Sequence, residues 1–280
     1  MPDKFDLALE IAATHPKSVA RYLEESPSDS ASAFIDAVPD DLSSSILRSM
    51  LPYHAAKCID QLATDAAGRY LSALEPRFAA SIVRHVGTDR RDALVGAMTR
   101  PAAARVAILL RYPLSVVGAW INPTLPTLPL DCRIAEAKAR ILREGYADHH
   151  RIFVVDDDQG LAGFVRLFDL LDVELDRPLI DFLQSAPGSL RAGTSLDIAL
   201  DDQNWLNNDF LPVVDRHERL IGVLRYAVLR AAVSGPKTRI MEDGVSDTFM
   251  DLAEACYLGL ADVMKTSLAT EPPRTGSEGG

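Results

Sequence analysis

Two arginines of this 280-residue chain are placed where they could bind an anion. Arg166 and Arg225 are 59 residues apart, and each follows an apolar run at the point where a helix is expected to begin. A cation in the first turn of a helix opposes the helix dipole, so this placement is unfavourable unless an anion compensates for it. Phosphate is one such anion. A carboxylate, from Asp156, Asp215 or a second copy of the chain, is the other.

A carboxylate with potential binding chemistry follows the first of these arginines. Asp169 stands three residues after Arg166, so the two side chains can pair on the surface of one helix. Such a pair would occupy the carboxylate that a ligand could otherwise use. Val228 holds the equivalent position 59 residues later, so we expect any ligand that needs this carboxylate to bind near the first arginine alone.

Two groups of acidic residues could bind a divalent cation. The first group lies at the corners of the expected N-terminal helices, and the second follows residue 235. The candidates are Asp29, Asp36, Asp40, Asp41, Glu242, Asp243 and Asp247. Magnesium needs carboxylates brought together from separate elements while it keeps several waters. The two groups could supply them by facing each other, but a solvated acidic surface explains the same residues equally well.

Patterns typical of catalysis do not occur in the sequence. It has no glycine-rich phosphate loop, no nucleophile elbow and no HExxH pattern. The histidines are dispersed, and the run Asp156 to Asp158 is typical of a hairpin turn rather than of a metal site. We therefore do not expect an enzyme.

The elements that must position these side chains occur twice. Four residues recur 59 positions later: Val154, Asp156, Gly163 and Arg166 return as Val213, Asp215, Gly222 and Arg225. A constant offset indicates the duplication of a structural unit. Each copy has the pattern of a helix, a strand, a turn, a strand and a closing helix. We expect helices over 133–144, 167–175, 195–206 and 225–233, strands over 210–214 and 220–224 with their counterparts in the first copy, and an extended connector over 122–129.

A shorter period runs from His15 to Tyr112. Proline or threonine recurs every 11 to 13 residues, at Pro16, Pro27, Pro39, Pro52, Thr64, Pro76, Thr88 and Pro101. Proline is well tolerated in the first turn of a helix, and the residue seven positions after each of these is apolar. The spacing predicts a stack of short helices that bury their apolar stripes on one another, with a surface suited to a partner protein. A compact bundle without repeat symmetry is the alternative.

Composition narrows the class of protein further. The net charge of -11 argues against binding to nucleic acid, and three cysteines without ligand spacing are typical of reduced, cytoplasmic thiols. The sequence shows neither a signal peptide nor a membrane span, so we expect a cytoplasmic protein without membrane insertion. Residues 236–270 have the pattern of an amphipathic helix, and residues 271–280 have the composition of a disordered tail.

The duplicated unit resembles a tandem pair of CBS domains. The resemblance rests on Val154 to Asp156, on Gly163 with two apolar residues after it, and on Asp169 three residues beyond Arg166, all preceded by a helix and repeated once. It implies that two such pairs form a flat dimer that senses adenine nucleotides or magnesium. It also implies that Asp169 corresponds to a carboxylate that binds ribose hydroxyls. The family usually has serine or threonine where this chain has Arg166, which puts that role in doubt.

The helical array that ends at Tyr112, directly ahead of this pair, is similar to the N domain of MgtE-type magnesium channels. It also resembles the helical arrays of a flagellar motor switch protein. In the channels, acidic residues between the two parts gather magnesium and close a membrane pore. Here no membrane domain follows, so we expect any transport to belong to another chain.

The expected fold is therefore α+β and multidomain, an all-α solenoid followed by a CBS pair. The predicted domains are residues 1–117, 118–176, 177–235 and 236–270, with the tail over 271–280. The expected function is that of a homodimeric sensor of Mg2+ or of AMP, ADP or ATP, with Asp169, Arg166 and Arg225 as nucleotide-binding candidates. A constitutive dimeric scaffold without a small-molecule ligand is the alternative.

Overall fold

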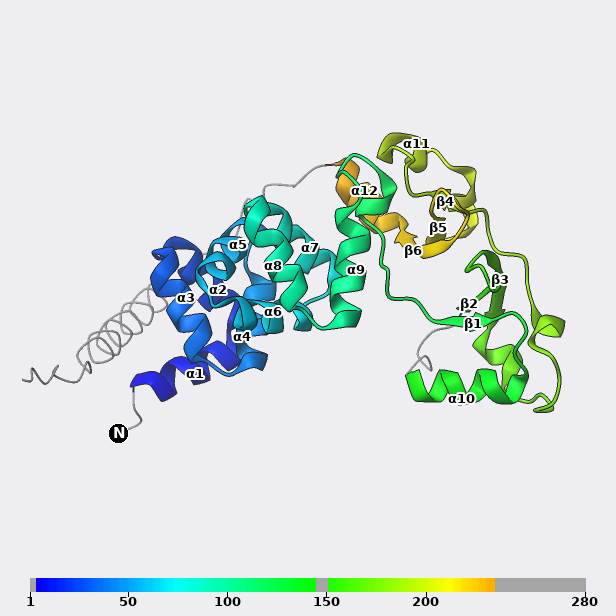
Figure 1. Cartoon of the computed structure of the whole chain (residues 1–280), viewed down its shortest axis with the longest axis horizontal. Coiled ribbons are helices and arrows are strands. Elements are labelled where there is room, and N and C mark those ends of the chain that lie inside the picture. The colour runs from blue at the N-terminus through cyan, green and yellow to red at the C-terminus, as the bar shows by residue number, and fades with distance from the viewer. Residues whose placement is uncertain (1–3, 145–150, 235–280) are drawn as a thin grey trace, which may run out of the picture. The chain divides into compact units, whose positions relative to one another are not determined.

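The computed structural model describes residues 4–144 and 151–234, with side chains from residue 8 onward (Figure 1). The predicted helix over 236–270, the predicted tail and the acidic residues Glu242, Asp243 and Asp247 lie outside the described residues. The described residues divide into two compact units. One holds residues 4–74 and 85–97, and the other holds residues 75–84 and 98–234.

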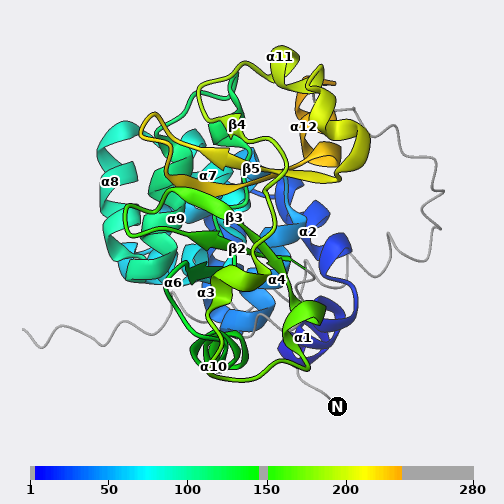
Figure 2. The same ribbon diagram turned by 90° about the vertical axis from the view of Figure 1, so that its right-hand side faces the viewer.

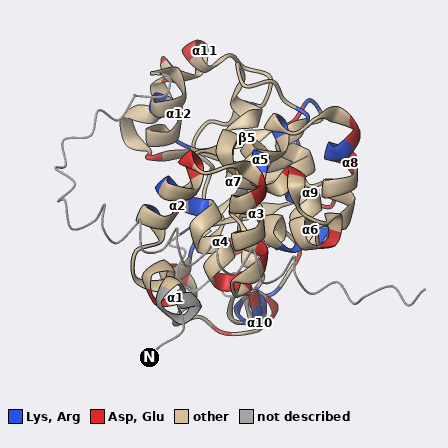
Figure 3. Cartoon of the chain, turned by 90° about the vertical axis from the view of Figure 1, so that its left-hand side faces the viewer, with Lys and Arg blue, Asp and Glu red and all other residues tan. Residues whose placement is uncertain are grey.

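The described N-terminal residues form nine short helices, of which the spacing predicted all but the first. They are α1 (Lys4–Thr14), α2 (Pro16–Glu25), α3 (Ser28–Ala37), α4 (Asp40–Ser49), α5 (Pro52–Gln61), α6 (Thr64–Ala73), α7 (Pro76–His85), α8 (Thr88–Ala97) and α9 (Arg100–Leu110). Each predicted proline or threonine lies at the N-cap or in the first two residues of its helix. Within the first unit, α2 packs on α4, α3 on α5 and α6 on α8, which is the contact pattern of a stacked array. Acidic and basic residues are interspersed along these helices (Figure 3).

The apolar stripe predicted for the array is confirmed in most of its helices. The residue seven positions after the start is buried in six of them, at Leu23, Phe34, Ile46, Ile59, Leu71 and Val83. The prediction is wrong for α8 and α9, where Val95 and Ile108 are half-buried and the neighbouring Leu94 and Leu109 are fully buried. Small residues allow close contact between helices. A Cβ atom on Gly68 of α6 would lie 2.5 Å from the carbonyl oxygen of Ala97 in α8.

The second unit contains the duplicated structure. The first copy comprises β1 (Thr127–Pro129), α10 (Ile134–Glu144), β2 (Arg151–Val155), β3 (Leu161–Arg166) and the short 3-10 helix η3 (Leu167–Leu170). The second comprises β4 (Leu190–Arg191), α11 (Leu196–Leu200), the 3-10 helix η5 (Gln203–Asn207), β5 (Phe210–Val214), β6 (Leu220–Arg225) and α12 (Tyr226–Val233). The 3-10 helices η1 (Val117–Ala119) and η4 (Leu179–Phe182) precede the two copies.

Both copies build the same small sheet. Its first strand pairs parallel with the second, and the second pairs antiparallel with the third. The two sheets adjoin through a bridge between Gly160 and Arg219, and Figure 2 shows their strands side by side. The core of the first copy is apolar, with Leu128, Ile134 and Val154 fully buried.

The offset of 59 residues holds for the whole of each hairpin. β5 and β6 begin and end 59 residues after β2 and β3, and the pairing register shifts at Val154 and again at Val213. Gln159 and Glu218 are the residues other than glycine with positive φ in the described chain, at 66° and 59°, and they occupy the same turn position. The duplication therefore extends to the backbone conformation of the turns.

Three expectations for this unit need correction. The connector over 122–129 contains the strand β1, because an edge strand can end in a proline that has no N–H to donate. The helix expected over 167–175 is only η3, since the Lys138 ammonium donates to the carbonyl oxygens of Leu171 and Val173. The helix expected over 195–206 divides into α11 and η5, because the Asp202 side chain accepts the N–H of Asn204 and starts a new turn.

Candidate functional site

The Asp169 carboxylate lies in η3 and is already hydrogen-bonded. Arg166 Nε donates to Asp169 Oδ2 over 2.8 Å, and Gln184 Nε2 donates to the same oxygen over 2.9 Å. The predicted pair of Arg166 and Asp169 is thus present, and its hydrogen bond raises the pKa of the Arg166 guanidinium. The Asp169 side chain keeps 23% of its surface exposed, so a ligand could still reach it.

Gln184 was not among the residues predicted for this site. It reaches Asp169 because residue 184 forms an antiparallel bridge with Phe164, with backbone hydrogen bonds of 3.0 and 2.8 Å. This bridge joins the segment after η4 to the edge strand β3. Nothing in the residues around position 184 signals such a contact.

Arg166 and Arg225 lie at equivalent positions of the two copies. Arg166 is the N-cap residue of η3 and Arg225 the N-cap residue of α12, and both are exposed. Asp156 is not the partner of Arg166, because Asp156 lies in the turn ahead of the six-residue strand β3 and Arg166 is the last residue of that strand. Asp156 Oδ1 instead accepts the backbone N–H groups of Asp158 and Gly160, at 3.0 and 2.7 Å. The prediction that residues 156–158 form a hairpin turn is therefore confirmed.

The structure does not bring the acidic candidates of the array together as a metal site. Asp40 lies 3.6 Å from Arg69 Nε, and Asp36 is exposed on α3. Within residues 4–144 and 151–234, no three histidine, cysteine or acidic side chains are grouped so that they could hold a metal ion. The remaining candidates, Glu242, Asp243 and Asp247, cannot be placed because they lie outside the described residues.

The buried thiols are not reactive groups of a site. Cys58 and Cys132 are free and buried, and desolvation raises the pKa of each thiol to about 11. At neutral pH both remain protonated, and the thiolate is the nucleophilic form. They therefore serve as small apolar side chains of the core.

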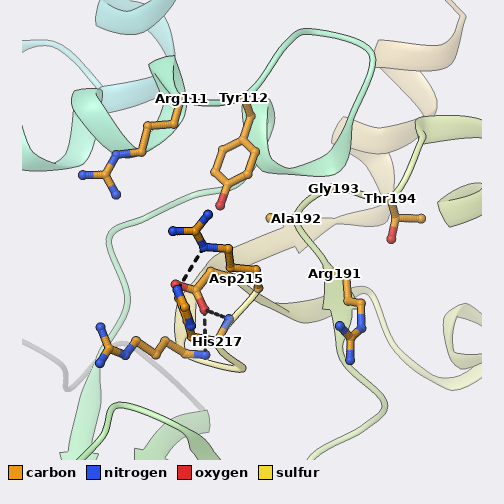
Figure 4. A pocket seen from close by; sticks show the side chains of 10 residues that line it. Arg111, Tyr112, Arg191, Ala192, Gly193, Thr194, Asp215 and His217 are labelled. Carbon is orange, nitrogen blue, oxygen red and sulfur yellow. Dashed lines mark hydrogen bonds between the residues drawn. The ribbon is translucent and has the colours of Figure 1, made fainter.

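The second unit also contains a basic hollow that the sequence did not predict. It has a volume of about 840 Å³ and is formed by the end of the array, the residues after β4 and the β5–β6 turn (Figure 4). We call it the basic pocket. Its lining residues are Arg111, Tyr112, Arg191, Ala192, Gly193, Thr194, Asp215, Arg216, His217 and Arg219.

Backbone hydrogen bonds fix the walls of the basic pocket. Val117 N–H donates to the carbonyl oxygen of Thr194 over 2.9 Å, and Gly118 N–H donates to that of Ala192 over 2.8 Å. Figure 4 shows the Tyr112 side chain pointing from the end of the array toward the turn that carries Asp215. Burial is the main cause that raises the pKa of the Tyr112 hydroxyl, and the nearby Asp215 charge raises it further. The hydroxyl thus stays protonated at neutral pH and can donate a hydrogen bond.

The fold defines a class of protein in which a helical array precedes two copies of a small α/β unit. Residues 14–115 match the family model of the MgtE intracellular N domain, and residues 117–176 match that of the CBS domain. These matches assign residues 14–115 to an MgtE N domain and residues 117–176 to a CBS domain, and the second copy repeats the sheet topology of the first. None of its described helices is long and apolar enough to cross a membrane.

Solved structures share this fold at low sequence identity. The soluble part of a magnesium transporter is 15% identical, with a TM-score of 0.55, and the alignment covers 82% of this chain and 97% of that one. The cytosolic domain of the Mg2+ channel MgtE in complex with ATP is 18% identical, with a TM-score of 0.48, and the alignment covers 81% and 89%. The comparison with curated proteins found no match. At 15% identity, the likeness to the first of these structures shows the fold alone.

Proposed function

We propose that this protein is a regulatory sensor. Its CBS pair would bind an adenine nucleotide or Mg2+, and the helical array would pass the bound state to a partner protein. The observation that carries this proposal is the succession of an MgtE N domain and a CBS domain in one chain. A relay of this kind requires a ligand whose affinity differs between two arrangements of the protein.

The described residues favour a nucleotide over a metal ion as the ligand. The Asp169 carboxylate is partly exposed and is flanked by Arg166 and Gln184, which offers an acceptor for sugar hydroxyls beside a guanidinium for phosphate. Mg2+ would need ligands from Asp36 or Asp40 together with residues beyond position 234. Val228 replaces the carboxylate in the second copy, so we propose one nucleotide per chain.

A thermal-shift panel with Mg2+, Ca2+, AMP, ADP, ATP and S-adenosylmethionine tests the proposal. A ligand that binds only the folded state raises the melting temperature with a saturable dependence on its concentration. We expect a nucleotide shift in the wild type that is lost in Asp169→Ala, while any Mg2+ shift remains. Asp172→Ala is the matched control, because Asp172 is exposed two residues beyond η3 and its removal changes the charge equally. A flat response to all six compounds would contradict the proposal.

A constitutive scaffold is the second candidate function. Arg166 and Gln184 already occupy the Asp169 carboxylate, and the second copy lacks that carboxylate, so both clefts could be filled by their own side chains. A flat thermal-shift panel, combined with an intact dimer, would favour this candidate.

We also propose that the chain forms a homodimer through its CBS pair. Large apolar side chains are exposed on the helical elements of both copies. They are Leu142 at 76%, Phe168 at 81%, Leu171 at 62%, Ile198 at 69% and Leu206 at 84%. Exposed apolar surface on this scale is typical of an interaction site.

Light scattering coupled to size-exclusion chromatography tests the dimer. The double variant Phe168→Asp with Leu206→Asp should elute as a monomer, because charged side chains would be buried without partners. Leu51→Asp is the control, since Leu51 is 60% exposed but belongs to the helical array. A dimer that survives the double substitution would place the interface elsewhere.

A further inference from the structure

The two hairpin turns have the same backbone but different charges, because residues 156–160 carry three carboxylates and no cation, whereas residues 215–219 carry two arginines and two carboxylates. In the first, Asp156 N–H donates to the Gly160 carbonyl oxygen over 3.0 Å, and in the second, Asp215 N–H donates to that of Arg219 over 2.9 Å. Asp215 Oδ1 accepts the backbone N–H groups of His217 and Arg219, at 2.8 and 3.0 Å, just as Asp156 does in its own turn. The hydrogen bonds of the second turn therefore do not require the side chains of its arginines. The presence of these arginines needs another explanation.

Basic side chains dominate the basic pocket although the chain as a whole is acidic. Four of its ten lining residues are arginines, and its one carboxylate, Asp215, is bound by its own turn. Within the described part of the chain, Arg111 and Arg219 have no carboxylate within 4 Å. Like charges gathered in one hollow repel one another, so an anion that enters it would relieve the repulsion.

The other two arginines, Arg191 and Arg216, also line the basic pocket. Arg191 pairs with Glu218, and Arg216 Nε donates to His217 Nε2 over 2.9 Å. Because His217 Nε2 accepts that bond, its Nδ1 carries the proton of a neutral ring and can donate. The described turn arginines make no ion pair with Asp157 or Asp158 of the adjoining first turn. The pocket thus combines several donors with few acceptors.

We propose that the basic pocket is a binding site for a phosphate-bearing small anion. Guanidinium groups bind phosphate oxygens with paired, charge-assisted hydrogen bonds, and the Tyr112 hydroxyl and the Thr194 side chain add neutral donors. The phosphates could belong to inorganic polyphosphate or to the tail of a nucleotide. The site is separate from Asp169 and from Val228, which follow the far ends of β3 and β6.

Calorimetric titration of the full chain with inorganic triphosphate, without Mg2+, tests the proposal. Triphosphate has no ribose, so its binding does not depend on the carboxylate of Asp169, and Asp169→Ala should bind it as the wild type does. A parallel titration with ATP and adenosine distinguishes the two sources. We expect triphosphate to bind and adenosine not to bind in the basic pocket, and ATP to bind there if nucleotides are the source. Failure of triphosphate to bind would overturn the proposal and would leave the proposed nucleotide site at Asp169 standing.

Two pairs of variants assign the binding to the basic pocket. Arg111→Gln with Arg219→Gln should weaken triphosphate at least about tenfold, because it removes two charged donors. Arg100→Gln with Arg105→Gln removes the same charge from exposed positions of α9 and should leave the affinity within about twofold.

The second pair adds a carboxylate instead of removing a guanidinium. A Cβ atom on Gly193 meets no heavy atom within 4 Å, so Gly193→Glu fits the fold and places a negative charge in the pocket. Gly96→Glu is its control, because Gly96 has equally open space but lies in α8. We expect Gly193→Glu alone to abolish triphosphate binding. Equal affinity in Gly193→Glu and Gly96→Glu would show that the anion binds elsewhere.

Discussion

A comparison of the two CBS hairpins distinguishes the residues that the fold requires from those that a ligand could use. Strands, register shift and positive-φ residue agree between β2–β3 and β5–β6. Side chains at the two ends of each hairpin differ in charge. The turns carry Asp157 and Asp158 in one copy and Arg216 and Arg219 in the other. The shared apolar positions and turn aspartates thus specify the sheet, while the exposed positions remain free to acquire binding chemistry.

The far ends of the hairpins differ in the same sense as the turns, with the more acidic side chain in the first copy. The first copy has a hydrogen-bonded carboxylate at Asp169, and the second has Val228. An acidic turn is thus combined with a carboxylate at the far end in one copy, and a turn whose two arginines balance two carboxylates is combined with an apolar residue in the other. The duplication therefore provides two candidate sites of different chemistry. We propose that the site at Asp169 binds a nucleotide and that the basic pocket binds a phosphate-bearing anion.

The largest expected effect that tests the equivalence of the copies concerns Gly163 and Gly222. Each lies beside a segment that crosses its hairpin, through the bridges of Gln184 with Phe164 and of Asn122 with Val223. A Cβ atom would lie 2.4 Å from the Gln184 carbonyl oxygen at Gly163 and 2.8 Å from the Asn122 carbonyl oxygen at Gly222. Alanine at either site should lower the free energy of unfolding by about 1–3 kcal/mol, with the larger loss at Gly163.

Urea unfolding followed by tryptophan fluorescence measures these losses, because Trp120 and Trp205 both belong to the second unit. Gly193→Ala is the control, since open space surrounds its Cβ position, and it should change the free energy by no more than about 0.5 kcal/mol. A larger loss at Gly222 than at Gly163 would show that the two crossings are not equivalent in packing.

The hairpins and the array could be predicted because their signals are local. Alternation of apolar residues, an aspartate turn and a regular spacing of prolines each act within about a dozen residues. The offset of 59 fails for the first strands, where Leu128 pairs with Val154 but Leu190 pairs with Val213. The reason is that α10 has eleven residues and α11 only five, so the copies differ in length ahead of the hairpin.

The site residues that the sequence did not predict all depend on contacts between distant segments. Gln184 reaches Asp169 through a bridge to β3, and the basic pocket joins Arg111 to residues about 80 to 110 positions later. No pattern around Arg111 or Gly193 marks such a meeting. The four arginines of the basic pocket come from separate segments of the sequence, and only the fold brings their charges close together.

The smallest expected effect concerns the turn aspartates Asp156 and Asp215. Both accept backbone N–H groups of their turns, but the charges around them differ. Asp156→Ala and Asp215→Ala each remove the acceptor of two backbone N–H groups, so each should lower the free energy of unfolding by about 1 kcal/mol at high salt. At low salt the losses should diverge. Asp156 lies beside Asp157 and Asp158, so its removal relieves repulsion, whereas Asp215 is the carboxylate among the arginines of the basic pocket.

The corresponding asparagine variants show whether charge causes that divergence. Asparagine keeps an oxygen that can accept both N–H groups but carries no charge. We therefore expect Asp215→Asn to lose stability mainly at low salt and Asp156→Asn to gain a little there, in the same fluorescence-detected urea titrations. If both asparagine variants instead respond to salt in the same direction, the different charges around the two turn aspartates have no energetic consequence. A phosphate-bearing anion would then gain nothing from repulsion among the arginines, and its affinity would rest on direct hydrogen bonds alone.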